Sequence, residues 1–170
     1  IGVMDLRLDE QEAALLLAAA GVELDEHELS DLTDRTEGWP AGLYLAALSM
    51  QTGAAGPLGG GGFTGDDRFV SEYLRDELLS RVPAEEATFL KYTSVLERMS
   101  GGLCDAVLQT TGSADTLDTL GRTNGFVVRL DRRREWYRYH QLFGQLLRNE
   151  LERNEPDVVT ELNRRAMAWC

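Results

Sequence analysis

The chain has 170 residues, 43% of them hydrophobic and 27% charged, which are the proportions of an ordinary globular protein able to bury one core or two small ones. Acidic residues outnumber basic ones by 29 to 17, and the formal charge of −12 opposes nonspecific association with DNA or an acidic membrane surface. Apolar stretches such as AALLLAAA are far shorter than the roughly 20 residues of a membrane-spanning helix, and no signal segment opens the chain, so we expect a cytoplasmic protein without membrane contact.

The cysteines and the chain ends give two further expectations. Cys104 lies in a helical stretch and Cys170 is the last residue, so neither suggests a disulfide framework, and their spacing excludes a clustered metal site. A reducing compartment fits this usage. Because the chain begins with Ile1 and stops on an amphipathic helix, we expect a segment of a longer protein.

Residues 1–50 predict a small helical subdomain. Asp9 is an acceptable cap for a first helix that Gly21 would end, and a short second helix is expected over about 25–36. Pro40 predicts the start of a third helix, because the missing N–H of proline costs nothing in a first turn. This explains Pro40 but leaves open why Trp39 precedes it.

Residues 51–65, QTGAAGPLGGGGFTG, have no periodicity and predict a flexible glycine-rich linker. A phosphate-binding loop is the alternative for the four consecutive glycines. Such a loop needs a Lys-Ser or Lys-Thr ending and a preceding buried strand, and both are missing from this stretch.

Residues 66–155 predict a winged-helix domain. An amphipathic helix follows the linker, and three short helices are expected to start at Pro83, Ser100 and Ser113, with both serines as caps. FVVRL and WYRYH are β-branched and aromatic runs joined by DRRRE, which predicts a β-hairpin over about 126–139. A helix follows, and residues 156–170 predict the start of another helical region. The expected fold class is mainly α: a helical lid bundle, a winged-helix domain with one hairpin, then C-terminal helices.

Catalysis by this segment is poorly supported. His27 and His140 are the only histidines, and neither lies in a recognisable Ser, Cys or metal motif. Acidic pairs such as Glu85-Glu86 stand at helix starts, where compensation of the helix dipole explains them. We therefore predict no catalytic residue and no metal site.

The hairpin carries the one basic cluster, and on a winged helix a basic wing can lie against DNA phosphates. The helix that would read DNA, SADTLDTLGRTN, supplies only Arg122 as a base, and Asp131 and Glu135 lie within the wing. A solvated hairpin is therefore favoured, and direct DNA binding stays as an alternative. The arginines of the cluster are Arg129, Arg132, Arg133, Arg134 and Arg138.

His140 stands where the second strand gives way to a helix. A histidine packed between aromatic neighbours is one interpretation of this position. The other is functional, because the first N–H groups of a helix favour an anion and His140 could donate to a phosphate beside them.

Four stretches of the sequence resemble one family. TEGWPAGLYLAALSM, GDDRFVSEYLRDELL, TSVLERMSGGLCDAVL and EWYRYHQLF occur in this order and at this spacing in the large LuxR-type regulators resembling MalT, whose ATPase module is a signal-transduction NTPase of the STAND class. The resemblance extends over essentially the whole chain. It implies the helical lid and winged helix of that module, downstream of a nucleotide-binding α/β domain that is absent here.

The resemblance also implies which residues contact a nucleotide. A Gly-x-Pro element of the family packs against adenine, which matches Gly38-Trp39-Pro40, and its winged-helix histidine reaches the β-phosphate of ADP, which matches His140. Gln141 stands where related regulators often have a second His. The residues implied as switch or secondary contacts are Arg138, Tyr139 and Gln141.

The function implied is that of a regulatory fragment which closes over ADP in the inactive state. Its cofactors would be ATP or ADP, with Mg supplied by the upstream domain. Its partners would be that domain, a downstream sensor and effector, DNA through another domain, and a small-molecule or protein inducer, with oligomerisation in the ATP-bound state. The same cassette can regulate another effector such as a serine/threonine kinase, and a plain interaction scaffold is a third possibility. Walker motifs are absent, so we expect ATP hydrolysis, slow in this class, from the parent chain alone.

Overall fold

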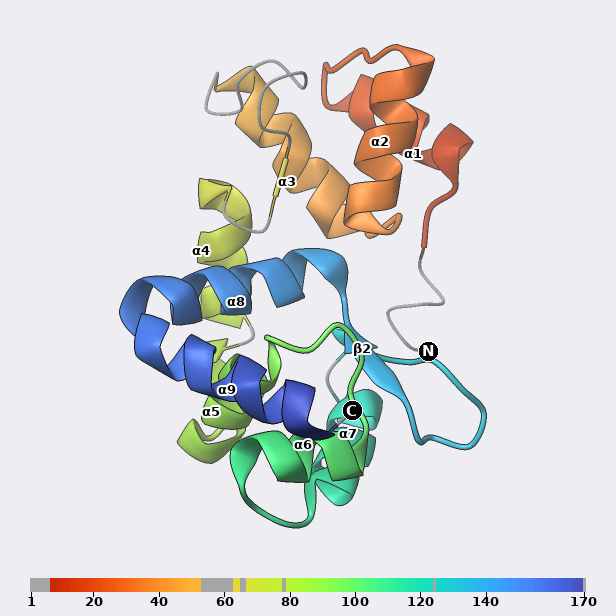
Figure 1. Ribbon diagram of the computed structural model, residues 1–170. Helices are drawn as coiled ribbons and strands as arrows, with labels where there is room; N and C mark the ends of the chain where they lie inside the picture. The colour runs from red at the N-terminus through yellow and green to blue at the C-terminus, as the bar shows by residue number, and fades with distance from the viewer. Residues whose placement is uncertain (1–6, 53–62, 65–66, 78, 124, 170) are drawn as a thin grey trace. The chain divides into compact units, whose positions relative to one another are not determined.

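The structure, a computed structural model, describes residues 7–52, 63–64, 67–77, 79–123 and 125–169 (Figure 1). The chain forms two compact units that divide between Arg81 and Val82. The first contains α1 (Glu10–Ala19), α2 (Glu26–Thr36), α3 (Pro40–Gln51), α4 (Arg68–Glu77) and the 3-10 helix η2 (Leu79–Arg81). The second contains α5 (Ala84–Thr93), α6 (Gly101–Leu108), α7 (Ser113–Thr123), β1 (Val127–Arg129), β2 (Tyr137–Tyr139), α8 (Gln141–Asn154) and α9 (Pro156–Trp169).

Capping boxes begin the first two helices. The Asp9 carboxylate accepts from the Glu12 N–H at 2.9 Å, and the Glu12 carboxylate accepts from the Asp9 N–H at 3.1 Å. Asp25 and Glu28 form the same pair before α2. Gly21, with φ of 75°, follows the end of α1 in the left-handed conformation that glycine tolerates. The limits predicted for these helices are confirmed.

The helix α4 packs against α3 within the first unit. Its Val70 and Leu74 side chains are fully buried, and the hydroxyl of Ser49 on α3 donates to the Asp67 carboxylate just before α4. The sequence prediction placed this helix in a winged-helix domain beginning at residue 66. The structure groups it with the first unit because its apolar face meets α3. Most of the predicted linker over 51–65 lies outside the described residues.

Three helices precede the hairpin in the second unit. The Ser100 hydroxyl accepts from the Leu103 N–H at 3.3 Å and caps α6, as predicted. Ser113 was predicted to cap α7 but is the first residue of that helix. The position before it is occupied by Gly112, whose φ of 93° is a conformation that glycine adopts readily. The Gly112 carbonyl accepts a hydrogen bond from the Asp115 N–H at 3.2 Å.

The strands β1 and β2 form the predicted antiparallel hairpin. Val127 pairs with Tyr139 and Arg129 with Tyr137. Tyr137 also exchanges backbone hydrogen bonds of 2.8 Å with Met99, so a segment before α6 extends the sheet by one bridge. Three helices followed by this hairpin make up the winged helix that the sequence predicts.

The helices after the hairpin close the core of the second unit. The whole apolar stripe predicted for α8 is buried, and α9 packs on both α6 and α8. Arg165 of α9 donates to the Val107 carbonyl at 3.0 Å. The sequence prediction began a separate region at Pro156, whereas α9 belongs to the second compact unit. The buried residues of the stripe are Leu142, Phe143, Leu146, Leu147 and Leu151.

Candidate functional site

The turn before α3 is fixed by contacts with the segment that precedes α1. Gly38 has φ of 68°, and a Cβ at this position would lie 2.4 Å from the Leu8 carbonyl oxygen. The Leu8 N–H donates to the Gly38 carbonyl at 2.8 Å, and Arg7 forms an ion pair of 2.8 Å with the Glu37 carboxylate. Both the backbone angle and the close approach therefore require glycine at position 38.

Trp39 packs in the core of the first unit. It is 8% exposed, and its ring leaves no room for a side chain at Gly42, where a Cβ would meet the indole at 2.7 Å. Its ring centroid lies 5.7 Å from that of Tyr73, with the planes inclined at 57°. Pro40, the first residue of α3, is half-buried. The indole is thus a core group, and only a small part of the Trp39 surface is left for a ligand.

His140 is the residue before the first turn of α8 and is 3% exposed. The backbone N–H of His140 donates to the Phe126 carbonyl at 2.8 Å. The imidazole ring meets the ring of Phe126 at a centroid distance of 5.7 Å and an angle of 74°. The N-terminus of a helix carries a partial positive charge and N–H groups without helical partners. The position therefore suits an anion, but the imidazole as packed here lies against an aromatic neighbour.

The neighbours of His140 have different environments. The Tyr139 hydroxyl lies 2.6 Å from the Thr93 hydroxyl, and its ring meets Phe143 edge-on at 5.8 Å. Burial raises the pKa of Tyr139, so its hydroxyl stays protonated. Arg138 donates to the Tyr139 carbonyl at 2.9 Å, and Gln141, the first residue of α8, is exposed. Tyr139 is a core residue in this structure.

The candidate nucleotide contacts fall into two groups, one in each compact unit. Gly38, Trp39 and Pro40 form one continuous turn in the first unit. Residues 138–141 form one strand-to-helix junction in the second. Each group is held by contacts within its own unit.

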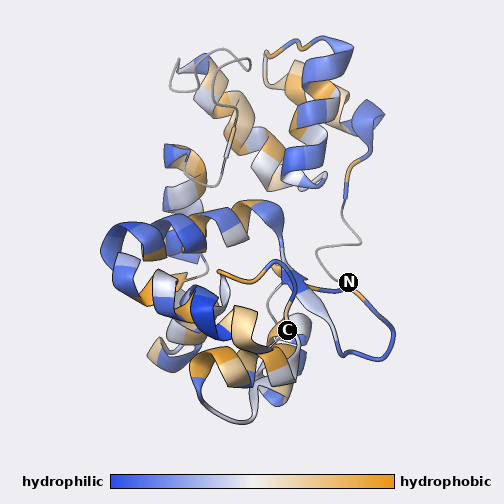
Figure 2. Ribbon diagram, viewed as in Figure 1, coloured by the Kyte–Doolittle hydropathy of each residue, from blue (hydrophilic) through white to orange (hydrophobic). Residues whose placement is uncertain are grey.

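One carboxylate on α7 gathers three arginines, a feature that sequence reasoning missed. Asp118 forms ion pairs with Arg122 on the same helix, with Arg129 on β1 at 3.4 Å and with Arg134 at 3.6 Å. The pair with Arg122 has the four-residue spacing that a helix brings together, but the other two depend on how the hairpin packs. The loop between the strands is strongly hydrophilic (Figure 2). Part of the basic cluster of the wing is therefore neutralised within its own unit.

Cys104, the cysteine that the structure describes, lies buried on α6. Burial raises the pKa of the Cys104 thiol to about 12, with a smaller contribution from the Asp105 carboxylate, so this thiol is unreactive at neutral pH. In the described ranges, no group of three or more His, Cys, Asp or Glu side chains is arranged to hold a metal ion. None of the helices that the structure describes has the length and apolar character needed to cross a bilayer.

Comparison with known proteins agrees with this fold. The model of the MalT winged helix domain family matches residues 75–159. The chain is 37% identical over 165 residues to the serine/threonine-protein kinase PknK of Mycobacterium tuberculosis, an alignment that covers 96% of this chain and 15% of the kinase. It is 32% identical over 171 residues to the HTH-type transcriptional regulator MalT of Klebsiella pneumoniae, covering 98% of this chain and 19% of that protein.

A second MalT regulator, from Yersinia enterocolitica, is 30% identical over 169 residues, again covering 98% of this chain and 19% of the relative. The chain thus spans between 15% and 19% of the length of these three relatives. The family match falls on the helices and hairpin described above, and the two MalT alignments extend over both compact units. The chain belongs to the MalT winged-helix family and corresponds to the winged-helix region of MalT-like regulators.

Proposed function

We propose that the chain is the regulatory fragment of a STAND-type ATP/ADP switch, which closes over ADP in the inactive state and transmits the nucleotide state to an effector. The observation that carries this proposal is that one segment aligns along nearly its whole length with proteins of two classes, a kinase and a transcriptional regulator. A segment common to proteins with different named outputs is suited to controlling an output rather than to supplying it.

The proposal assigns Gly38, Trp39 and Pro40 to the adenine and His140 to the β-phosphate. The turn at Gly38 is fastened to Leu8, which supports a fixed position for Pro40 and for the exposed part of Trp39. His140 stands at the positive end of α8, which supports a contact with an anion. Because the imidazole is 3% exposed, the proposal requires it to turn away from Phe126 when it meets a phosphate. An upstream domain of the longer protein would hold most of the nucleotide and the Mg ion.

The strength of one such contact is sufficient for a switch. A charge-assisted hydrogen bond contributes about 1.5–3 kcal/mol, which corresponds to roughly a tenfold to hundredfold change in affinity. A difference of this size between two states biases their populations appreciably. His140 would therefore act as a latch that favours the ADP-bound form.

The latch is tested by the ADP affinity of the parent protein, purified with its upstream domain. We expect His140→Ala to weaken ADP binding about tenfold to a hundredfold. His27→Ala is the matched control, because His27 is the other histidine of the chain and lies exposed on α2. Circular dichroism confirms that both variants fold. Unchanged ADP affinity in folded His140→Ala protein would contradict the latch.

The remaining parts of the proposal concern the longer protein. An inducer, either a small molecule or a protein, would bind a downstream sensor and let the module exchange ADP for ATP and oligomerise. The effector would be a DNA-binding helix-turn-helix or a kinase domain. The parent would hydrolyse ATP slowly in its upstream domain. A measurable ATPase rate in the purified 170-residue segment would overturn this division of roles.

Direct DNA binding by the winged helix is the second candidate, favoured by the arginines of the wing. The ion pairs of Asp118 with Arg129 and Arg134 oppose it, because they place a carboxylate among the cations that would meet phosphates. We expect no DNA retention in a mobility-shift assay at low salt. Retention that falls steeply with salt, and disappears when Arg132, Arg133 and Arg134 are neutralised, would favour this candidate instead.

A further inference from the structure

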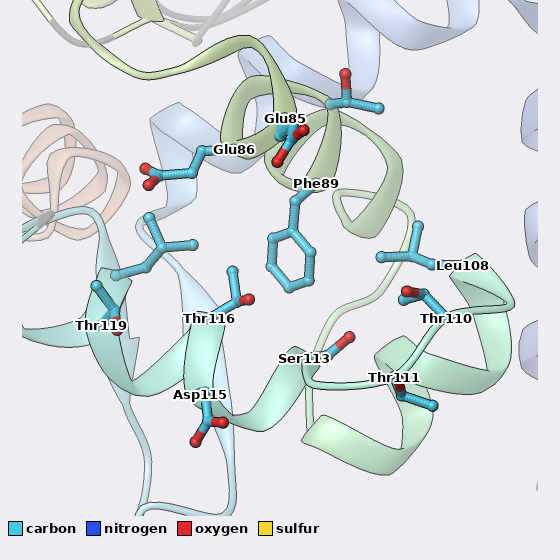
Figure 3. Close-up of a pocket in the computed structure, with 12 residues that line it drawn as sticks. Glu85, Glu86, Phe89, Leu108, Thr110, Thr111, Ser113, Asp115, Thr116 and Thr119 are labelled. Atoms are coloured by element: carbon cyan, nitrogen blue, oxygen red, sulfur yellow. The ribbon is translucent and has the colours of Figure 1, made fainter.

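A pocket of about 590 Å³ opens in the second unit between α5, the end of α6 and α7 (Figure 3). Its volume lies within the range of about 300–1,000 Å³ that is typical of small-molecule sites. The residues assigned above to the nucleotide do not line it. The pocket therefore needs an explanation separate from the nucleotide switch.

Carboxylates stand on opposite sides of this pocket. Glu85 and Glu86 come from the first turn of α5, and Asp115 comes from the first turn of α7 (Figure 3). Neither lysine nor arginine occurs among the described residues that line it. Each carboxylate complements the dipole of its own helix, but their shared effect is a negative potential at the mouth of the pocket. This potential favours a cationic guest.

The interior offers an apolar surface beside hydroxyl groups. The Phe89 ring projects toward the middle of the pocket, with Leu108 across from it (Figure 3). Thr110 and Thr116 bring hydroxyl oxygens to the same space. An aromatic face attracts a cation, and hydroxyl oxygens accept hydrogen bonds from an ammonium group. A guest with an ammonium group on an apolar body matches both surfaces.

Ser113 supplies an independent indication of a ligand. The residue is 2% exposed, and its Oγ has no hydrogen-bond partner in the part of the chain that the structure describes. Its backbone N–H is satisfied by the Asp105 carboxylate at 3.0 Å. Figure 3 shows the hydroxyl turned toward the interior of the pocket. Because buried polar groups in native proteins are nearly always hydrogen-bonded, this unpaired oxygen is available to a guest once the Ser113 side chain turns to meet it.

We propose that this pocket binds a small organic cation, a primary ammonium carried on a short aromatic or aliphatic body. The ammonium donates to the Ser113 hydroxyl and to a carboxylate at the rim, and the body packs against Phe89 and Leu108. The volume of the pocket fits a free amine of this kind. The proposal is independent of the nucleotide switch, because its residues are different.

The test uses the intact chain, labelled with ¹⁵N and titrated with 2-phenylethylammonium chloride. We expect saturable amide shifts at the residues that line the pocket. The matched probe is 2-phenylethanol, which has the same aromatic body and a hydroxyl in place of the ammonium, and we expect it to bind about tenfold more weakly. Equal affinity for the two probes would overturn the proposal in favour of a purely apolar pocket. Absence of saturable shifts with the amine would overturn it outright.

Two variants test which residues bind the ammonium. Glu86→Gln removes one charge with little change in shape and should weaken amine binding about tenfold. Glu97→Gln is the matched control, because Glu97 is an exposed carboxylate of the same unit that does not line the pocket, and its amine affinity should equal that of the wild type.

Ser113→Ala separates a ligand contact from a structural role. The variant should bind the amine more weakly yet unfold at a denaturant concentration no lower than the wild type, because the lost hydroxyl has no protein partner. A less stable Ser113→Ala protein, or one that binds the amine with unchanged affinity, would overturn the role of this serine. Wild-type affinity in both Ser113→Ala and Glu86→Gln would overturn the site.

Discussion

Gly38 holds the turn that presents Trp39 and Pro40. Its positive φ and its approach to the Leu8 carbonyl are two separate constraints, and either alone disfavours a side chain. The Leu8 N–H returns a hydrogen bond to the Gly38 carbonyl, so the segment before α1 and the turn before α3 are fastened to each other. The absence of a Cβ at Gly38 therefore allows the segment before α1 to approach the turn before α3.

Gly38→Ala should therefore lower the free energy of unfolding of the first unit by about 2 kcal/mol or more, since it adds a steric clash to an unfavourable φ. The matched control is Gly21→Ala. Gly21 has φ of 75°, but a Cβ there meets nothing closer than the Gln51 side chain at 3.7 Å, so its cost should be about 1 kcal/mol. Urea denaturation of both variants measures the difference. Equal losses would show that the contact with Leu8 is unimportant.

Elements whose limits depend on nearby residues could be predicted from the sequence. Asp9, Asp25 and Ser100 mark helix starts because a cap acts within one turn, and the alternation of Tyr137, Arg138 and Tyr139 marks a strand. The assignment of α4 to the first unit could not be predicted, because an apolar helix face does not specify its partner. The packing of α9 within the second unit escaped prediction for the same reason.

Glu155 connects α5 to the junction between α8 and α9. Its carboxylate accepts hydrogen bonds from the Lys91 ammonium and, at 2.8 Å, from the Tyr92 hydroxyl. The hydrogen bond from Lys91, with that from Tyr92 second, lowers the pKa of Glu155 below its usual value. The hydrogen bond that the Tyr92 hydroxyl donates to Glu155 raises the pKa of Tyr92. The ionised carboxylate is thus the form that joins these elements.

Glu155→Gln should make the free energy of unfolding less dependent on pH on the acidic side. A carboxyl whose pKa is lowered on folding stabilises the protein above its unfolded pKa, and that contribution disappears as the pH falls through the folded pKa. As the pH falls below about 5, the wild type should therefore lose more free energy of unfolding than Glu155→Gln. Urea denaturation at a series of pH values gives the two slopes. A Glu155→Gln profile parallel to that of the wild type would refute this role.

Across the whole molecule, the division after Arg81 makes a prediction about fragments. Val70 and Leu74 of α4 are fully buried in the first unit, and Tyr73 of the same helix meets Trp39. Burial of each large aliphatic side chain contributes about 1.5–3 kcal/mol. A fragment of residues 1–81 should therefore unfold at a clearly higher temperature than a fragment of residues 1–66. Coincident thermal transitions in circular dichroism would place α4 outside the core of that unit.

For the candidate sites, the sequence could predict the positions of residues within a helix or strand but not their contacts with distant segments. The sequence placed His140 at the start of a helix and Pro40 in a first turn, and both positions hold. The burial of His140 against Phe126, the three ion pairs of Asp118 and the hydroxyl of Ser113 in its pocket all depend on contacts between distant segments. No local pattern encodes such contacts, because each requires the hairpin and helices to be assembled first.

The most direct test of the nucleotide switch is the identity of the nucleotide released when the parent protein, purified with its upstream domain, is denatured. We expect ADP from the wild type and from His27→Ala, and little or none from folded His140→Ala. Equal ADP from His140→Ala and the wild type would confine His140 to packing against Phe126. A wild-type protein that releases no nucleotide would contradict the switch itself.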